Sequence, residues 1–181
     1  FAEMTVLGNL LVGHHLHVKY DSFSAALGTR STRNQESSLR DEMMELLSFI
    51  GLADFAELYA SELSVGQRRL LALGRAMAMR PKLLMLDEPF AALDSFTREE
   101  LWCVMRDLWQ QKNITVVLVN HDLPEAVFLA DRICVMSSRP GKILVDRKVD
   151  LPRPRELDIC FTQEFISIVH ELRGHISKAR I

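Results

Sequence analysis

Residues 82–94 read KLLMLDEPFAALD, in which a short apolar run leads directly into two adjacent carboxylates, Asp87 and Glu88. Two further apolar runs follow at 114–119 and 133–136. Continuous apolar runs of this length are typical of strands that are buried on both faces of a parallel sheet. We therefore expect the first run to be a buried strand that ends at the two carboxylates.

Three other segments carry apolar residues at the spacing of an amphipathic helix: 35–50, 101–108 and 165–176. A fourth helix is marked by Ser64 and Gln67, because the Ser-x-x-Gln pattern satisfies free N–H groups of a first helical turn. This helix is expected to stop at Pro81. Residues 21–38 are polar and show no period, which predicts a surface loop.

Strands and helices alternate through the second half of the chain. The Arg-Pro-Gly sequence at 139–141 predicts a turn, after which 143–149 returns as an antiparallel strand. The order strand, helix, strand, short helix, strand is typical of an α/β domain.

The composition excludes several classes of protein. Basic and acidic residues nearly cancel, 22 against 24 in 181 residues, so charge gives no reason to expect a nucleic-acid partner. The three cysteines are scattered, which favours reduced, packed thiols over a disulfide framework or a zinc site. No run reaches the roughly 18 to 20 apolar residues that a membrane span needs.

Ionisable side chains follow two of the predicted strands. Asp87 and Glu88 follow the first, and His121 follows the second. Ligands bind at the carboxyl ends of parallel strands, so we expect these three groups to converge. One carboxylate there can hold Mg²⁺ beside substrate phosphates, another can activate water, and an imidazole can bind a phosphate oxygen. The arrangement predicts nucleotide hydrolysis.

Four motifs, taken together in this order and at this spacing, carry a resemblance to a known family. They are LSVGQ at 63–67, LMLDEP at 84–89, ALD at 92–94 and NHD at 120–122. In turn they resemble the signature motif, Walker B strand, D-loop and switch-histidine motif of the ATP-binding cassette (ABC) ATPases. The resemblance covers essentially the whole chain.

The resemblance implies a role for each matching residue. Asp87 would bind Mg²⁺ through water, Glu88 would be the catalytic base, and His121 would contact the γ-phosphate of ATP. Asp94 would communicate across an ATPase dimer. Three residues at the start of the signature helix would contact the ATP held by the other subunit: Ser64, Gly66 and Gln67.

One element of the family does not occur in these 181 residues, which contain no Gly-x-x-x-x-Gly-Lys-Ser/Thr loop to cradle the phosphates. We therefore expect the carboxyl-terminal portion of a P-loop NTPase (RecA-like) core with a mainly parallel sheet, plus an α-helical subdomain. The expected parts are a helical subdomain ending in the signature helix, the second half of the ATPase core and a carboxyl-terminal helical extension, at 1–80, 81–150 and 151–181.

Two stretches resemble different bacterial importer ATPases. The opening FAEMTVLGNLLVGHHL is similar to those for branched-chain amino acids, whereas FAALDSFTREEL and later residues are similar to those for nitrate, sulfonate or taurine. The resemblance implies uptake of a small solute driven by ATP hydrolysis. It also implies a second ATPase subunit, identical or different, transmembrane permease subunits and, indirectly, a solute-binding protein. The expected location is cytoplasmic, peripheral on the inner face of the cell membrane.

Two other functions stay open. A truncated cassette without its own phosphate loop would act as a non-catalytic regulatory or interaction module. A chromosome-maintenance or repair ATPase shares the signature and Walker B motifs, but it would show a long coiled coil before the signature.

Several conspicuous residues favour structural roles. Three histidines lie close together near the start: His14, His15 and His17. They have no Cys or carboxylate at ligand spacing, so an exposed or loop-edge cluster is expected rather than a metal site. Trp102 and Trp109 are expected to pack on a helix face, and the Pro-Arg-Pro-Arg sequence at 152–155 is expected to start a linker.

Overall fold

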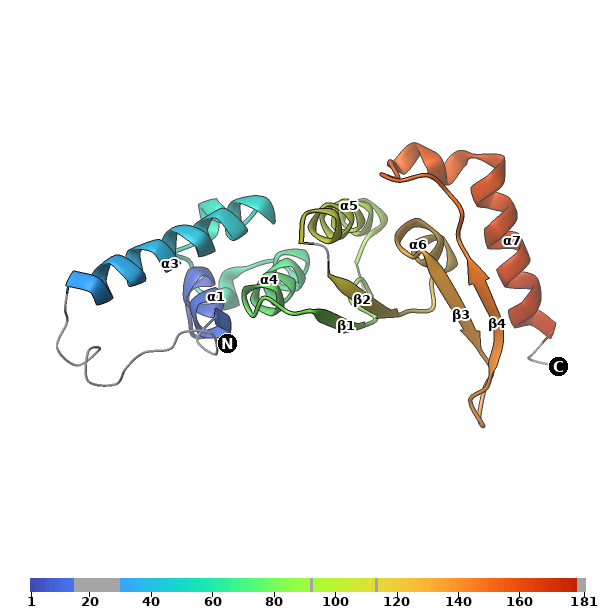
Figure 1. The fold of residues 1–181 in the computed structure, drawn as a ribbon, viewed down its shortest axis with the longest axis horizontal. Coiled ribbons are helices and arrows are strands. Elements are labelled where there is room, and N and C mark those ends of the chain that lie inside the picture. Colours follow the sequence, from blue (N-terminus) through green and yellow to red (C-terminus); the bar gives the residue numbers. More distant parts are fainter. Residues whose placement is uncertain (15–29, 92, 113, 179–181) are drawn as a thin grey trace. The chain divides into compact units, whose positions relative to one another are not determined.

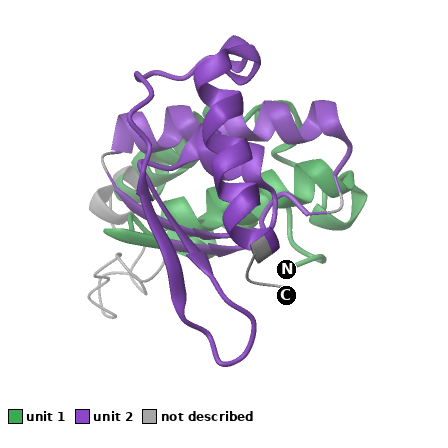
Figure 2. Ribbon diagram, turned by 90° about the vertical axis from the view of Figure 1, so that its right-hand side faces the viewer, with its two compact units in different colours: residues 1–84 green, residues 85–181 purple. Residues whose placement is uncertain are grey.

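The structure of the protein, a computed structural model, describes residues 1–14, 30–91, 93–112 and 114–178. The chain divides into two compact units, residues 1–84 and 85–181, which Figure 2 colours separately. Both units contain buried apolar side chains. Within the described ranges, no helix is long and apolar enough to cross a membrane.

The first unit is built from helices. These are α1 (Val6–His14), α3 (Arg30–Phe49) and α4 (Val65–Ala78), with the short helices η2 (Ala53–Phe55) and η3 (Ala60–Glu62) between the last two (Figure 1). The three long helices pack against one another around buried residues such as Leu10 and Leu47. α1 and α4 approach closely at Gly13, where a Cβ would lie only 2.7 Å from the backbone oxygen of Arg75.

The prediction of a surface loop at 21–38 is wrong in part. α3 begins at Arg30, so residues 30–38 are helical, while 21–29 lie outside the described residues. Neither Gly nor Pro interrupts 30–49. Once the amphipathic part of the helix has formed, each further residue adds a hydrogen bond at little cost, so the polar residues extend the helix.

The helix predicted after Ser64 is confirmed. The Oγ of Ser64 accepts a hydrogen bond from the N–H of Gln67 (3.2 Å), and the N–H of Ser64 donates to Oε1 of Gln67 (2.9 Å). This reciprocal pair is the capping box that the sequence predicted. The helix ends at Ala78, shortly before Pro81.

His14 is buried, although the sequence predicted an exposed or loop-edge position for the histidine cluster. It is 7% exposed, and its Nδ1 donates to the carbonyl of Ala78 (3.0 Å). That carbonyl belongs to the last turn of α4, whose backbone acceptors have no partner within the helix. The side chain therefore secures the end of α4, while His15 and His17 lie outside the described residues.

In the described ranges, the strands form two separate two-stranded sheets. β1 (Leu83–Asp87) pairs with β2 (Thr115–Val119), and β3 (Arg132–Met136) pairs with β4 (Ile143–Lys148). The second pair is antiparallel, as predicted, with Arg132 opposite Lys148. The helix α5 (Ser95–Lys112) connects β1 to β2. Because the N–H of Glu88 donates to the carbonyl of Val119 (2.8 Å), the carboxyl ends of β1 and β2 lie side by side.

The expected single, mainly parallel sheet with both faces buried is wrong for the described residues. In β1 only Leu84 is buried, and Met85 is 69% exposed. In β2 no residue is buried, and Val119 is 55% exposed. An apolar strand is buried only where other elements cover it. The apolar runs therefore indicated strands correctly but not the burial of those strands in this chain.

Helices complete the second unit. They are α6 (Leu123–Leu129), η4 (Leu157–Phe161) and α7 (Gln163–Lys178), and α6 contacts α5, η4 and α7. Trp102 of α5 is buried and stacks on Phe128 of α6, with ring centroids 5.5 Å apart. The guanidinium of Arg153 lies 4.2 Å from the ring centroid of Trp109. The predicted packing role of the two tryptophans is confirmed.

Arg155 is a buried anchor for the end of α6, rather than part of a linker. Its side chain is 0% exposed. Nη1 donates to the carbonyls of Val127, Phe128 and Ala130 at 2.7–3.0 Å, and Nη2 donates to that of Val149 (3.3 Å). Burial lowers the pKa of Arg155 to about 10, so the guanidinium stays charged at neutral pH. It satisfies carbonyls that the helix end leaves free, and its charge complements the helix dipole.

We predict that Arg155→Ala lowers the free energy of unfolding of the second unit by about 3 kcal/mol, because the carbonyls lose a buried, charged donor. Both tryptophans lie in this unit, so urea unfolding followed by tryptophan fluorescence measures it. Arg132→Ala is the control, since that exposed arginine forms a surface ion pair with Asp146 and its loss is expected to cost under about 1 kcal/mol. Equal effects of the two substitutions would contradict the anchoring role.

Candidate functional site

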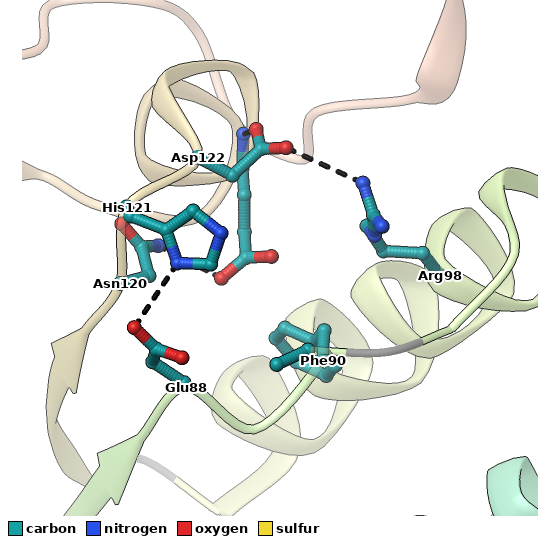
Figure 3. Close-up of a pocket in the computed structure, with 8 residues that line it drawn as sticks. Glu88, Phe90, Arg98, Asn120, His121 and Asp122 are labelled. Carbon is teal, nitrogen blue, oxygen red and sulfur yellow. Dashed lines mark hydrogen bonds and ion pairs between the residues drawn. The ribbon is translucent and has the colours of Figure 1, made fainter.

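Glu88 and His121 meet at the edge where β1 and β2 end. The Nδ1 of His121 lies 3.1 Å from Oε1 of Glu88, and Figure 3 shows the two side chains facing each other. Both are accessible, with 74% of the His121 and 51% of the Glu88 side chain exposed. The site therefore holds a carboxylate and an imidazole together at the surface, where a ligand can reach both.

The backbone at Glu88 is in a conformation that favours glycine. Its φ is +43°, a left-handed value that costs a non-glycine residue about 1 kcal/mol. The hydrogen bond from its N–H to Val119 offsets that cost, because it fixes the turn against β2. The strain lies at the residue whose carboxylate faces His121.

A small pocket adjoins this pair. It is lined by residues of the loops after β1 and β2 and by the helices that follow them: Glu88, Phe90, Ala91, Arg98, Asn120, His121, Asp122 and Glu125. Asp122 caps α6 by accepting from the N–H of Glu125 (3.0 Å), and Arg98 on α5 forms an ion pair with Asp122 at 3.3 Å (Figure 3). Arg98 also donates to the carbonyl of Leu93 (2.9 Å). It thus ties the loop after β1 to the loop after β2.

Glu125 is a buried carboxylate at the back of the pocket. It is 3% exposed, and its oxygens accept from Nδ2 of Asn120 (2.8 Å) and Nε1 of Trp102 (3.3 Å). Burial raises the pKa of Glu125 above its ordinary value, although these two hydrogen bonds favour the charged form. Neither donor is a cation, so the carboxylate is held by neutral dipoles.

The other acidic residues predicted for the site occupy different positions. Asp87 is the last residue of β1 and is exposed, directly before Glu88. Asp94 lies at the start of α5, where it accepts from the N–H (3.0 Å) and hydroxyl (2.7 Å) of Thr97. These bonds lower the pKa of Asp94. Within the described part of the chain, no group of acidic, His or Cys side chains is arranged to hold a metal by itself.

Ser64, Gly66 and Gln67 belong to the first unit, at the amino-terminal end of α4. The side chains of Ser64 and Gln67 are engaged with each other's backbone in the capping box. Their predicted contact with ATP stays a prediction, as do the roles of Asp87, Glu88, Asp94 and His121.

Comparison with known proteins shows which family the chain resembles. The profile of the ABC transporter family matches residues 2–91. A solved inward-facing structure of a putative metal-chelate type ABC transporter superposes on 94% of this chain and 59% of that one, with a TM-score of 0.63 and 25% identity. The chain is similar to the ATP-binding cassettes of ABC transporters. The predicted resemblance is confirmed at this level.

Among curated proteins, the chain is similar to importer ATPases. It is 48% identical over 116 residues to the aliphatic sulfonates import ATP-binding protein SsuB of Yersinia pestis, which is 64% of this chain and 42% of that protein. It is 42% identical over 121 residues to SsuB of Bacillus licheniformis, which is 67% of this chain and 48% of that protein. The matched region thus spans just under half the length of these relatives.

Two pocket residues were missed by reasoning from the sequence. Arg98 and Glu125 follow the recognised motifs by four and three residues, each one turn into the next helix. That spacing places a side chain back over the turn from which its helix begins. It was therefore a usable signal that both residues reach the site.

We predict that Glu125→Gln changes the pH dependence of stability. Because the folded state holds the Glu125 proton to a higher pH than the unfolded state does, the free energy of unfolding falls as pH rises from about 4.5 through the folded pKa. Glutamine does not titrate, so the variant gains stability relative to the wild type over that interval. Urea midpoints measured by tryptophan fluorescence between pH 4 and 8 test this, and parallel curves would contradict it.

Proposed function

We propose that the protein carrying this chain is the ATP-hydrolysing subunit of an ABC importer. The observation that carries the proposal is the contact of Glu88 with His121 at 3.1 Å, at the joined carboxyl ends of two strands. Nucleotide chemistry in open α/β sheets takes place at such an edge. The match of residues 2–91 to the ABC transporter family supports ATP as the nucleotide.

Three side chains have separate roles in the proposed hydrolysis of ATP. Glu88 takes a proton from water while the water oxygen bonds to the γ-phosphorus and the bond to the leaving ADP oxygen breaks. His121, whose ring lies beside Glu88, donates a hydrogen bond to a γ-phosphate oxygen. Asp87 fits Mg²⁺ held through water, because its carboxylate is exposed and adjoins Glu88. The bound Mg²⁺ would neutralise charge on the phosphates.

The nucleotide site needs parts from outside these residues. The phosphate-cradling loop does not occur in the 181 residues, so we infer that another segment supplies it. Ser64, Gly66 and Gln67 are proposed to contact the ATP of a partner ATPase subunit from the end of α4, where backbone N–H groups and the helix dipole favour an anion. Asp94, at the start of α5, is proposed to communicate with that partner.

The proposal extends to the cargo, the partners and the roles of the parts of the chain. Two of them are named as aliphatic sulfonate importers, which supports a sulfonate-like anion over a branched-chain amino acid as the transported solute. We propose that residues 1–80 dock on a permease, that 81–150 form half of the ATPase core, and that 151–181 brace it. The assembly would lie on the cytoplasmic face of the cell membrane, with a solute-binding protein delivering the cargo.

A second candidate function is a non-catalytic module that pairs with an intact cassette. The observation that favours this module is that the 181 residues contain no phosphate-cradling loop. Binding of labelled ATP to the 181-residue chain is expected to be weak under either proposal. Tight, Mg²⁺-dependent binding to the isolated chain would show that its phosphate site is complete, contrary to both.

We predict that Glu88→Gln in the complete ATPase lowers kcat by about 10² to 10⁴-fold and leaves ATP binding intact, because only proton removal from water is lost. Steady-state phosphate release and equilibrium ATP binding measure the two effects. Glu100→Gln, an exposed change on α5, is the control and is expected to hydrolyse ATP normally. Normal turnover by Glu88→Gln would remove Glu88 from the base role, and a complete protein that binds but never hydrolyses ATP would favour the non-catalytic module.

A further inference from the structure

The loop that carries His121 is fixed by its neighbours rather than by His121 itself. The side chain of Asn120, on one side, donates to Glu125 (2.8 Å). The side chain of Asp122, on the other, accepts from the N–H of Glu125 (3.0 Å) and pairs with Arg98. His121 is left with an exposed ring whose bond to Glu88 depends on where this backbone places it.

Glu125 is the residue on which both flanking contacts converge. Its carboxylate holds the side chain before His121, and its N–H holds the side chain after it. Its second oxygen accepts from Trp102, and Trp102 is buried and stacked on Phe128. Glu125 therefore lies on a helix, α6, that the stacked rings pack against α5, and its contacts with Asn120 and Asp122 pass the rigidity of that helix to the loop.

A carboxylate is chemically required for this arrangement. The two donors approach different oxygens of Glu125, so both oxygens must accept. A glutamine at this position offers one accepting oxygen and one N–H₂ group, which would face a donor. Burying a carboxylate is costly, and a side chain that only filled space here would be apolar. The buried carboxylate of Glu125 thus indicates a role in positioning its neighbours.

We propose that Glu125 is a positioning residue for His121, acting through Asn120, so that the imidazole faces Glu88 and the reacting phosphate. The proposal rests on the function proposed above. It assigns no contact between Glu125 and ATP, which distinguishes it from the catalytic residues.

The kinetic test uses the complete ATPase with three variants. Asn120→Ala removes this contact, and Glu125→Gln leaves one of the two donors facing an N–H₂ group, so each is expected to lower kcat by about tenfold to hundredfold, with KM for ATP changed less than about twofold. The double variant is expected to lose no more than either single one, because the two residues act as one unit. Trp102→Phe is the matched control. It removes the other donor to Glu125 but keeps an aromatic ring beside Phe128 and leaves the Asn120 contact in place, so it is expected to lower stability but not kcat.

A spectroscopic test on the 181-residue chain is independent of hydrolysis. The ¹⁵N signals of the His121 ring, assigned by their loss in His121→Ala, are expected to change alike in Glu88→Gln, Glu125→Gln and Asn120→Ala, and to keep their wild-type values in Trp102→Phe. If Glu125→Gln does not fold, Asn120→Ala still decides the question.

The outcomes separate the two proposals. Unchanged His121 signals in Asn120→Ala and Glu125→Gln, or equal kinetic losses in Trp102→Phe and Glu125→Gln, would reduce Glu125 to a structural role and overturn the inference. A wild-type protein that hydrolyses no ATP, but whose His121 signals respond as described, would overturn the proposed function and leave the positioning role supported.

Discussion

The hydrogen bond from the N–H of Glu88 to the carbonyl of Val119 is the constraint on which the site depends. It joins the carboxyl ends of β1 and β2, so two loops that are far apart in the sequence begin at the same place. Glu88 itself has a left-handed backbone, and its carboxylate faces His121. The site thus combines a small backbone strain at Glu88 with a short distance between two reactive groups.

The helix α6 connects this constraint to the rest of the second unit. It has only seven residues, too few to be stable alone, and charged side chains secure both of its ends. Asp122 caps the start, beside His121, and Arg155 anchors the end with several carbonyl contacts. The proposed orientation of His121 therefore depends on residues more than thirty positions away in the sequence.

The sequence predicted the helices and strands better than their burial and tertiary contacts. Motif spacing and helix caps are local, so the start of α4 at Ser64, the order of the strands and the meeting of Glu88 with His121 could be foreseen. Burial is not local, and the apolar strands β1 and β2 were wrongly expected to be covered. Arg155 could not be foreseen because its partners are backbone carbonyls, which carry no sequence signal. The same holds for His14, which contacts a helix end.

The central claim is that the edge formed by β1 and β2 presents Asp87, Glu88 and His121 to the terminal phosphate of ATP. A crystal structure of the complete protein with Glu88→Gln and Mg²⁺-ATP tests it most directly. The account predicts that His121 lies within hydrogen-bonding distance of a γ-phosphate oxygen, with Asp87 toward the metal and residue 88 toward the water in line for attack. A nucleotide bound with its γ-phosphate away from this edge would contradict the account.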